Sequence, residues 1–478
     1  MTIMTNKFYL HSAIPYVNAA PHIGHAQEFI YSDVIRRYHK LLHEDVLYLC
    51  GADENGLKII QAAQKAGVEP HKFCDIHQQE FLDLAKKLNV HFDIWQRGTN
   101  ENHFLSSQKL WELCTKSGDI YKKSYEGLYC VGCEAFYTSD ELNENGECFE
   151  HPGKKLDLIA EKNYFFRLSK YQKFFEELII SDALSIIPQS KKNETVAFIK
   201  KGLEDFSISR TKERAKGWGV PVPGDPDQIM YVWFDANNIY YSGIGLGWND
   251  ELFTKWAPAD LMIIGKGILR FHAIYWPAVL KSAGLPLPKQ LFVHGYLTVD
   301  GQKMSKTVGN VVDPIKVLNQ YGTDAVRYYL TREIPSYSDG DYSERRFKEL
   351  YNADLANGLG NLVARIAKLA ESQKCKMKNV NFQDVNTGEY KKALEEYRFN
   401  DALAYVWERV KTVDKFINEN QPWKLSGNDL IKVLDRAISQ IIEIATLLQP
   451  FLPQTAQKIL EQFRGPTILS QPSLFPRL

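Results

Sequence analysis

The chain carries two short motifs whose residue types suit phosphate groups. The first, Pro21-His22-Ile23-Gly24-His25, lies between a β-prone stretch and a long helical pattern. A helix N-terminus attracts anions through its N–H groups and dipole, and Gly24 allows a ligand close to the backbone. The two imidazoles can donate hydrogen bonds to phosphate oxygens as charge develops. Taken alone, this motif is as often two surface histidines beside a helix-starting glycine as it is a phosphate site. The strand–loop–helix context is what favours function.

The second motif is Lys303-Met304-Ser305-Lys306-Thr307, which follows a predicted Asp300-Gly301 turn. Two lysines three residues apart present two mobile ammonium charges to one anion. A lone pair with this spacing is usually a solvated basic loop. The two motifs in this order, separated by two strand-rich halves, are a much rarer coincidence, which favours a shared role in handling phosphate.

A third cluster has the spacing of a metal site. Cys130-x2-Cys133 is followed, after 14 residues, by Cys148-x2-His151. Three sulfurs and one imidazole suit tetrahedral Zn²⁺ with no open position, which predicts a structural knuckle rather than a catalytic metal. The alternative, three unrelated thiols, is much less frequent at this spacing. The remaining cysteines are scattered, and we expect small buried or idle thiols: Cys50, Cys74, Cys114 and Cys375.

The elements that must position these motifs alternate in type along the first part of the chain. Residues 7–12 and 45–50 read as strands, and helical patterns start near Gly24 and Gly56. This order predicts a parallel sheet with crossover helices.

The pattern changes twice further along the chain. The stretch from about Gly127 to Gly224 breaks the rhythm and reads as an insertion, after which strand-like runs resume at 229–234, 261–265 and 291–297. Beyond about Ser343 long amphipathic helices predict a helical bundle.

Composition excludes several classes of protein. The chain has 478 residues, 44% hydrophobic and 24% charged, which is close to the globular average and argues against disorder. Lys+Arg and Asp+Glu are both 58, so a polybasic nucleic-acid coat is not expected. No apolar run suggests a membrane span, and the N-terminus resembles neither a signal peptide nor a presequence. We expect a cytoplasmic protein.

The two phosphate motifs together resemble the HIGH and KMSKS signatures of class I aminoacyl-tRNA synthetases, and their neighbours resemble the methionyl-tRNA synthetase family in particular. The resemblance covers nearly the whole chain, including the cysteine cluster and the C-terminal helices. It is carried by five segments: SAIPYVNAAPHIGHA (12–26), CGADENG (50–56), YVWFDA (231–236), ILRFHAIYWPA (268–278) and FVHGYLTVDGQKMSK (292–306).

The resemblance implies a Rossmann-type doubly wound α/β fold with a zinc-knuckle insertion and a C-terminal α-helical bundle. The expected domains are the first half of the Rossmann domain (1–116), the insertion with the knuckle (117–225), the second Rossmann half (226–300), the KMSKS loop and stem-contact region (301–343) and the anticodon-binding helices (344–478). It also implies ATP with Mg²⁺, one structural Zn²⁺, methionine and tRNA(Met) as ligands.

The quoted segments suit a methionine site, because a thioether makes favourable contacts with aromatic rings. They supply Tyr16, Trp233, Phe271, His272 and Trp276, and Tyr240 follows shortly after the third segment. Asp53, at the C-terminal end of the second predicted strand, lies where an open parallel sheet places ligand groups, and would hold the α-ammonium.

The resemblance adds further residues to the site. It places Ala13, Ile14 and Ala236 in the methionine pocket. It assigns ATP binding to His22, Gly24, His25, Glu28, Gly265, Lys303 and Lys306, and a catalytic role to the two histidines and two lysines among them.

A fourth constellation lies in the helical third. Asn361 and Arg365 are four apart and share a helix face, and Pro422-Trp423 begins what reads as another helix. Without the resemblance, surface residues and a core tryptophan would be the favoured interpretation. With it, Asn361, Arg365 and Trp423 match the residues that hold the CAU anticodon by edge hydrogen bonds and stacking.

Three positions depart from the family pattern. Gly267 stands where an acidic residue commonly touches the ATP ribose; either another group such as Glu28 substitutes, or ATP binds more weakly. Asn237-Asn238-Ile239 replaces a more apolar stretch, and Thr307 keeps the hydroxyl of the usual serine.

The favoured function is therefore methionine–tRNA ligase, acting as a monomer. One alternative is a class I synthetase for Leu, Ile, Val or Cys, although the middle is short for an editing insertion and the Cys₃His set looks closed. Another is a tRNA-binding protein that has lost catalysis. A small HxGH nucleotidyltransferase explains neither the knuckle nor the helical third.

Overall fold

A computed structural model describes residues 6–130, 135–137, 142–149, 153–304, 309–373, 382, 385, 387–464 and 467–478. The chain divides into two compact units. Unit 1 comprises residues 1–21, 45–83 and 92–293, and unit 2 comprises residues 22–44, 84–91 and 294–478. Within the part of the chain that the structure describes, no helix has both the length and the apolar character to cross a membrane.

Unit 1 is built on a sheet that, within the described residues, has six strands in the order β3-β2-β1-β12-β13-β7. The chain starts in the middle at β1, moves to one edge, then returns to the other side of β1, which is the doubly wound order with its switch point at β1. The strands are β1 (Lys7–Ser12), β2 (Asp45–Ala52), β3 (Ile94–Arg97), β7 (Ser185–Ile187), β12 (Leu261–Gly265) and β13 (Gln290–His294).

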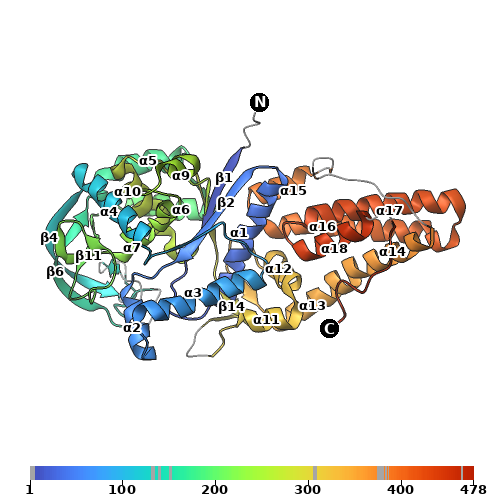
Figure 1. Cartoon of the computed structure of the whole chain (residues 1–478), viewed down its shortest axis with the longest axis horizontal. Coiled ribbons are helices and arrows are strands. Elements are labelled where there is room, and N and C mark those ends of the chain that lie inside the picture. Colours follow the sequence, from blue (N-terminus) through green and yellow to red (C-terminus); the bar gives the residue numbers. More distant parts are fainter. Residues whose placement is uncertain are drawn as a thin grey trace. The chain divides into compact units, whose positions relative to one another are not determined.

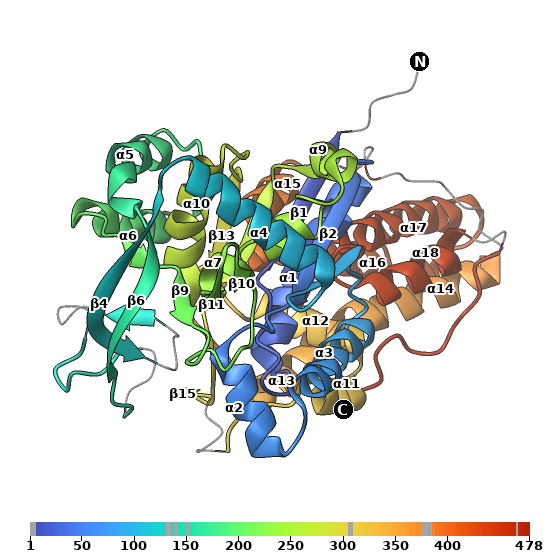
Figure 2. The same cartoon turned by 60° about the vertical axis from the view of Figure 1, so that its left-hand side comes forward.

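The strands read as nearly continuous apolar runs because helices cover both faces of a parallel sheet. In β2, every residue after Asp45 is buried. β1 pairs in parallel with β2 and with β12. The helices of this unit, seen in Figures 1 and 2, are α2 (Leu57–Ala66), most of α3 (Pro70–Lys87), α4 (Glu101–Lys116), α5 (Gln172–Ile180), α6 (Gln189–Lys200), α7 (Val232–Ala236), α8 (Ile239–Ser242), α9 (Asp250–Trp256) and α10 (Trp276–Ala283).

The middle of the chain forms two small antiparallel sheets beside the main one. The larger has the order β5-β4-β6-β8, and its long β4–β6 ribbon is prominent in Figure 2. The second has the order β10-β11-β9. β7, from this same middle stretch, instead joins the edge of the main sheet beside β13. The strands are β4 (Ile120–Cys130), β5 (Ala135–Tyr137), β6 (Asp157–Phe166), β8 (Phe206–Ser207), β9 (Ser209–Thr211), β10 (Pro221–Val222) and β11 (Asp225–Met230).

Two of the strands expected from the sequence end early. The run 229–234 was expected to be a strand throughout, but β11 stops at Met230 and α7 begins at Val232. The local β propensity is overridden by tertiary contacts, because buried Asp235 in the helical turn accepts hydrogen bonds from residues of other segments (described below). The run 291–297 breaks at Gly295, where a Cβ would lie 2.2 Å from the carbonyl oxygen of Ser338.

Unit 2 combines α1 (Ile23–Leu41) with a C-terminal region in which the helices beyond Ser343 were predicted. α14, α16, α17 and α18 run side by side (Figure 1). This unit also contains a small sheet, in which the strands follow the order β15 (Gln302–Lys303), β14 (Leu297–Val299) and β16 (Gly340–Tyr342). The other helices are α11 (Pro314–Tyr321), α12 (Thr323–Arg332), α13 (Glu344–Leu350), a π-helical turn (Tyr351–Gly360), α14 (Asn361–Gln373), α15 (Gly388–Glu395), α16 (Phe399–Asn420), α17 (Gly427–Leu448) and α18 (Pro453–Arg464).

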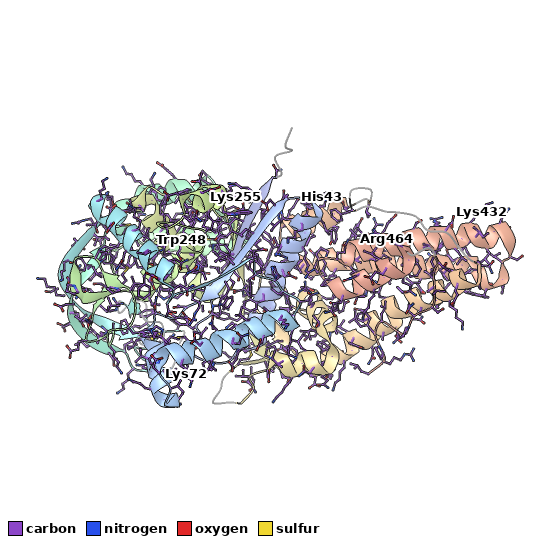
Figure 3. The ribbon with its side chains drawn as sticks, viewed as in Figure 1. His43, Lys72, Trp248, Lys255, Lys432 and Arg464 are labelled. Carbon is purple, nitrogen blue, oxygen red and sulfur yellow. The ribbon has the colours of Figure 1, made fainter. Side chains whose placement is uncertain are left out.

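Charged side chains mostly lie on the surface of each unit, as Figure 3 shows for Lys432 on α17. Lys255 on α9 pairs with Asp45 at the start of β2, 2.9 Å apart. The main exception is Arg327 of α12, which is fully buried and 2.8 Å from the equally buried Asp33 of α1.

Candidate active site

The first turn of α1 is built around the two histidines of the first motif. The Nδ1 atom of His22 accepts a hydrogen bond from the N–H of Gly24 at 3.1 Å, and Nδ1 of His25 accepts from the N–H of His22 at 3.1 Å. Because each Nδ1 is an acceptor, the proton of each neutral ring lies on Nε2, which makes Nε2–H the donor toward a phosphate. Burial, and then the charge of His22, lowers the pKa of His25 well below 6.5.

The second motif approaches the first within unit 2. The N–H of Ile23 donates to the carbonyl of Val312 at 3.2 Å, just beyond the lysine loop. The end of the Met304 side chain lies 3.9 Å from the position that a Cβ on Gly24 would take. The structure thus brings the glycine of one signature against the methionine of the other.

A tight turn joins β14 to β15 just before the lysine loop. Asp300 and Gly301 have φ values of 48° and 77°, which confirms the turn predicted there. Lys303 is exposed at the end of β15. Lys306 and Thr307 lie outside the described residues.

Glu28, one turn into α1, is engaged by a histidine to which sequence reasoning gave no role. Its Oε2 lies 2.9 Å from Nε2 of His294, whose Nδ1 is 2.8 Å from the carbonyl of Gly295. A ribose contact through Glu28 would therefore share its carboxylate with His294. Gly265 ends β12 in unit 1, and Gly267 is exposed in the turn that follows.

Most of the aromatic residues expected around methionine form a cluster in unit 1. The rings of Trp233 and Phe271 stack with centroids 3.9 Å apart and planes 4° apart. Tyr16 and His272 meet Trp233 edge-on at 6.5 and 6.3 Å. Such a wall of faces and edges suits a polarizable thioether.

Tyr240 and His272 form a hydrogen-bonded pair at this cluster. Tyr240 Oη lies 3.0 Å from Nε2 of His272, whose Nδ1 lies 3.0 Å from the carbonyl of Ile268. A carbonyl can only accept, so Nδ1 of His272 is protonated and Tyr240 donates to Nε2. Burial lowers the pKa of His272 from 6.5 to about 4, which keeps the ring neutral at physiological pH.

Asp53 is held beside the aromatic wall by backbone pairing. Its N–H donates to the carbonyl of Pro15 at 2.9 Å, and it forms a parallel bridge with Tyr16. The backbone pairing places Asp53, which is buried, alongside Tyr16 just beyond the carboxyl ends of β1 and β2.

The remaining residues expected in the pocket pack in different clusters. Ile14, Tyr16, Trp233 and Ala236 share one small apolar cluster, while Ala13 packs on the main core. Trp276 is a core residue, 1% exposed and edge-on to Tyr241, so its contact with methionine stays a prediction.

A buried polar network, which sequence reasoning missed, holds the helix that carries Trp233. Asp235 of α7 accepts from Nε2 of His103 at 2.8 Å, from the hydroxyl of Ser107 at 2.8 Å and from the amide of Asn55 at 2.6 Å. The amide of Asn238 donates to the same Ser107 at 3.1 Å. His103 and Asp235 are 132 residues apart, so spacing gave no signal of this contact.

The structure describes only part of the Cys/His cluster predicted to bind zinc. The sulfurs of Cys130 and Cys148 face each other at 3.2 Å, and both residues are buried. Cys133 and His151 lie outside the described residues. Cys50, Cys74 and Cys114 are buried, as expected, and Cys375 is outside the described residues.

Of the three residues expected at the anticodon, two line one hollow of unit 2 and the third, Trp423, lies near one of them. Asn361 and Arg365 line a hollow of about 570 Å³ between α14 and α16. The guanidinium of Arg365 donates to Asp414 and to Asn418, each at 2.8 Å, and lies 6.0 Å from the ring centre of Trp423.

Trp423 sits on a single 3₁₀ turn (Pro422–Lys424) before α17, where a longer helix was expected to start. The tryptophan is 53% exposed, which excludes the interpretation as a core residue. An exposed ring beside a fixed guanidinium is the combination that stacks an unpaired base.

A doubly wound sheet, a histidine signature at the start of α1 and a lysine loop beside it define a class I aminoacyl-tRNA synthetase. A family model described as tRNA synthetases class I (M) matches residues 8–367. The chain belongs to the methionyl-tRNA synthetase family.

Individual relatives agree across nearly the whole chain. The methionine–tRNA ligase of Thermotoga maritima is 41% identical over 98% of this chain and 76% of its own length. That of a Nostoc species is 41% identical over 95% of this chain and 89% of its own. The structure of Mycobacterium tuberculosis methionyl-tRNA synthetase in complex with methionyl-adenylate superposes with a TM-score of 0.92 at 35% identity, covering 99% of this chain and 100% of that one.

Proposed function

We propose that the chain is a methionine–tRNA ligase, which activates methionine with ATP to methionyl-adenylate and pyrophosphate and then transfers methionine to the 3′-terminal adenosine of tRNA(Met). The observation that carries this proposal is the full-length likeness to a structure that holds methionyl-adenylate. The adjacency of the two signature motifs in unit 2 supports it.

In the first step a methionine carboxylate oxygen attacks the α-phosphorus of ATP and pyrophosphate leaves. No enzyme nucleophile is needed, so catalysis consists of positioning and electrostatic stabilisation. His22 and His25 donate Nε2–H to the phosphates, and Lys303 and Lys306 neutralise the pyrophosphate end. Mg²⁺, bound with ATP, supplies further charge neutralisation on the phosphates.

Methionine is held at its two ends. Asp53 binds the α-ammonium, and the stacked Trp233–Phe271 pair with Tyr16 forms the wall for the side chain. The neutral Tyr240–His272 pair suits an uncharged thioether better than a charged side chain, because a buried charge without a partner is costly.

In the second step a terminal ribose hydroxyl of tRNA attacks the adenylate carbonyl and AMP leaves. The anticodon is recognised by Asn361, Arg365 and Trp423. Asp414 and Asn418 fix the guanidinium of Arg365, so less conformational entropy is lost when it meets a base.

One Zn²⁺ fits the cysteine cluster. Cys130 and Cys148 already present two buried sulfurs toward one point, and Cys133 and His151 would complete a closed tetrahedral set. The metal would stabilise the fold of the insertion without a chemical role. The domain boundaries given above, a monomeric state and a cytoplasmic location complete the proposal.

The proposal is tested by the Lys306→Ala variant. Methionine-dependent ATP–pyrophosphate exchange should fall by at least 100-fold, a loss typical of one electrostatic group at a transition state, while methionine affinity stays within threefold. Unchanged exchange in this variant would contradict the assigned chemistry.

A further inference from the structure

A histidine that the proposed chemistry does not use lies under the aromatic cluster of unit 1. His11 is on β1, where alternate side chains point to the same face, so it shares a face with Tyr9 and Ala13. It is fully buried, and its ring stacks on Tyr240 with centroids 3.6 Å apart and planes 14° apart.

Besides this stacking, two hydrogen bonds hold Tyr240. The hydroxyl of Tyr9 donates to the carbonyl of Tyr240 at 2.6 Å, and the Tyr240 hydroxyl pairs with His272 at 3.0 Å. The two hydrogen bonds act on the hydroxyl and the backbone carbonyl of Tyr240, whereas His11 packs against the flat face of its ring. Its size therefore sets how far that ring can move away from the cluster.

The position of His11 along the strand corresponds to the deep end of the methionine pocket. Ala13 directly follows the end of β1, three residues before Tyr16, which bridges to the Asp53 proposed to hold the α-ammonium. His11 lies two residues back, about 6.6 Å deeper at about 3.3 Å per strand residue. A methionine held by its ammonium at Asp53 would extend its thioether toward this depth.

The ring of His11 is an uncharged aromatic group. Burial, and then the charge of His272, lowers the pKa of His11 well below 6.5. Neither ring nitrogen makes a hydrogen bond of good geometry with a described residue. What the ring contributes here is therefore shape and stacking.

We propose that His11 backs the Tyr240 ring on the side away from the methionine pocket and thereby sets the length of side chain that the pocket accepts. This inference rests on the proposed function, because it takes the aromatic cluster as the methionine site. It adds a specificity-determining residue that touches the substrate only through Tyr240.

The test compares methionine with ethionine, whose side chain is one methylene longer. Pyrophosphate exchange is measured for both amino acids with the same preparation, so that any unfolded fraction cancels in the ratio of the two kcat/KM values. The wild type should prefer methionine by about 10–200-fold, the usual value of one methylene in a fitted pocket. His11→Ala should lower that preference at least tenfold and raise the KM for methionine, with the KM for ATP within twofold.

Two control variants separate this role from general destabilisation. His11→Phe keeps a flat ring and loses no well-formed hydrogen bond, so its preference should stay within threefold of wild type. Leu10→Ala truncates a neighbour on the opposite face of β1 that is equally buried and should also leave the preference unchanged. If His11→Ala does not fold, His11→Val replaces it with the same expectation.

Each outcome decides one claim. An unchanged preference in the truncated variant, or an equal loss in Leu10→Ala, would overturn the role of His11 while leaving the ligase proposal intact. A wild type without methionine-dependent exchange would overturn both.

Discussion

Replacing Arg327 with methionine should destabilise unit 2 by about 4–5 kcal/mol. Burial lowers the pKa of the Arg327 guanidinium, an effect that the charge of Asp33 opposes. The guanidinium donates to the carbonyls of Phe451 at 2.7 Å, Pro450 at 2.8 Å and Leu88 at 3.2 Å, and pairs with Asp33 at 2.8 Å. It thereby ties α1 and α12 to the turn between α17 and α18.

The size of the effect follows from these contacts. Three carbonyls that lose their donor cost about 1 kcal/mol each. Asp33 keeps a second partner, Arg37 at 2.6 Å, so the stranded charge adds only about 1–2 kcal/mol rather than a full desolvation cost. The total lies within the roughly 3–5 kcal/mol seen when one partner of a buried ion pair is removed.

Urea and thermal unfolding followed by circular dichroism measure this loss. A lowering of Tm by roughly 8–20 °C is expected, at about 2–4 °C per kcal/mol for a unit of this size. Arg345→Met is the matched control, because Arg345 pairs with Glu349 on the surface with its side chain 80% exposed, and it should cost under about 1 kcal/mol. Equal stability losses in the two variants, or no coupling between Arg327→Met and Asp33→Asn, would refute the reasoning.

Three further predictions concern the anticodon groove, pH and zinc. Trp423→Ala should reduce aminoacylation of tRNA(Met) by about 5–150-fold, since one stacked base contributes about 1–3 kcal/mol, without changing pyrophosphate exchange; a matching loss of exchange would contradict an anticodon role. The free energy of unfolding should fall as pH drops from 6.5 toward 4, because the unfolded chain binds a proton on His272 (pKa about 4 when folded) that the folded chain does not. His272→Asn should remove up to about 3 kcal/mol of this loss, and urea unfolding that shows the same loss in the variant would count against it. Metal analysis should find one zinc per chain and none after Cys148→Ser, and zinc that persists in that variant would rule out the assigned ligands.

The parts of the structure that the sequence predicted are those with local signals. The strand at 261–265 coincides with β12, and α1 begins one residue before the predicted Gly24. The Asp300-Gly301 turn was predicted for the same reason, because a two-residue pattern of this kind has one favoured geometry. Strands buried on both faces, helix starts and turns can all be predicted from the types of neighbouring residues.

The parts that it missed depend on contacts between distant positions. The helical turn at Val232–Ala236 forms because Asp235 finds His103 in a buried network, and no local pattern reports that partner. The same holds for Glu28 with His294 and for His11 under Tyr240. In the candidate site, motif residues were found by type and spacing, whereas the residues that support them required the fold.

Pyrophosphate exchange measured separately with each of the twenty amino acids tests the central claim most directly. The account predicts ATP–pyrophosphate exchange with methionine alone, because the uncharged Trp233, Phe271 and Tyr240–His272 surfaces select a long apolar side chain and Asp53 selects its ammonium. Exchange driven by leucine, isoleucine, valine or cysteine in preference to methionine, or exchange with none of the twenty, would contradict it.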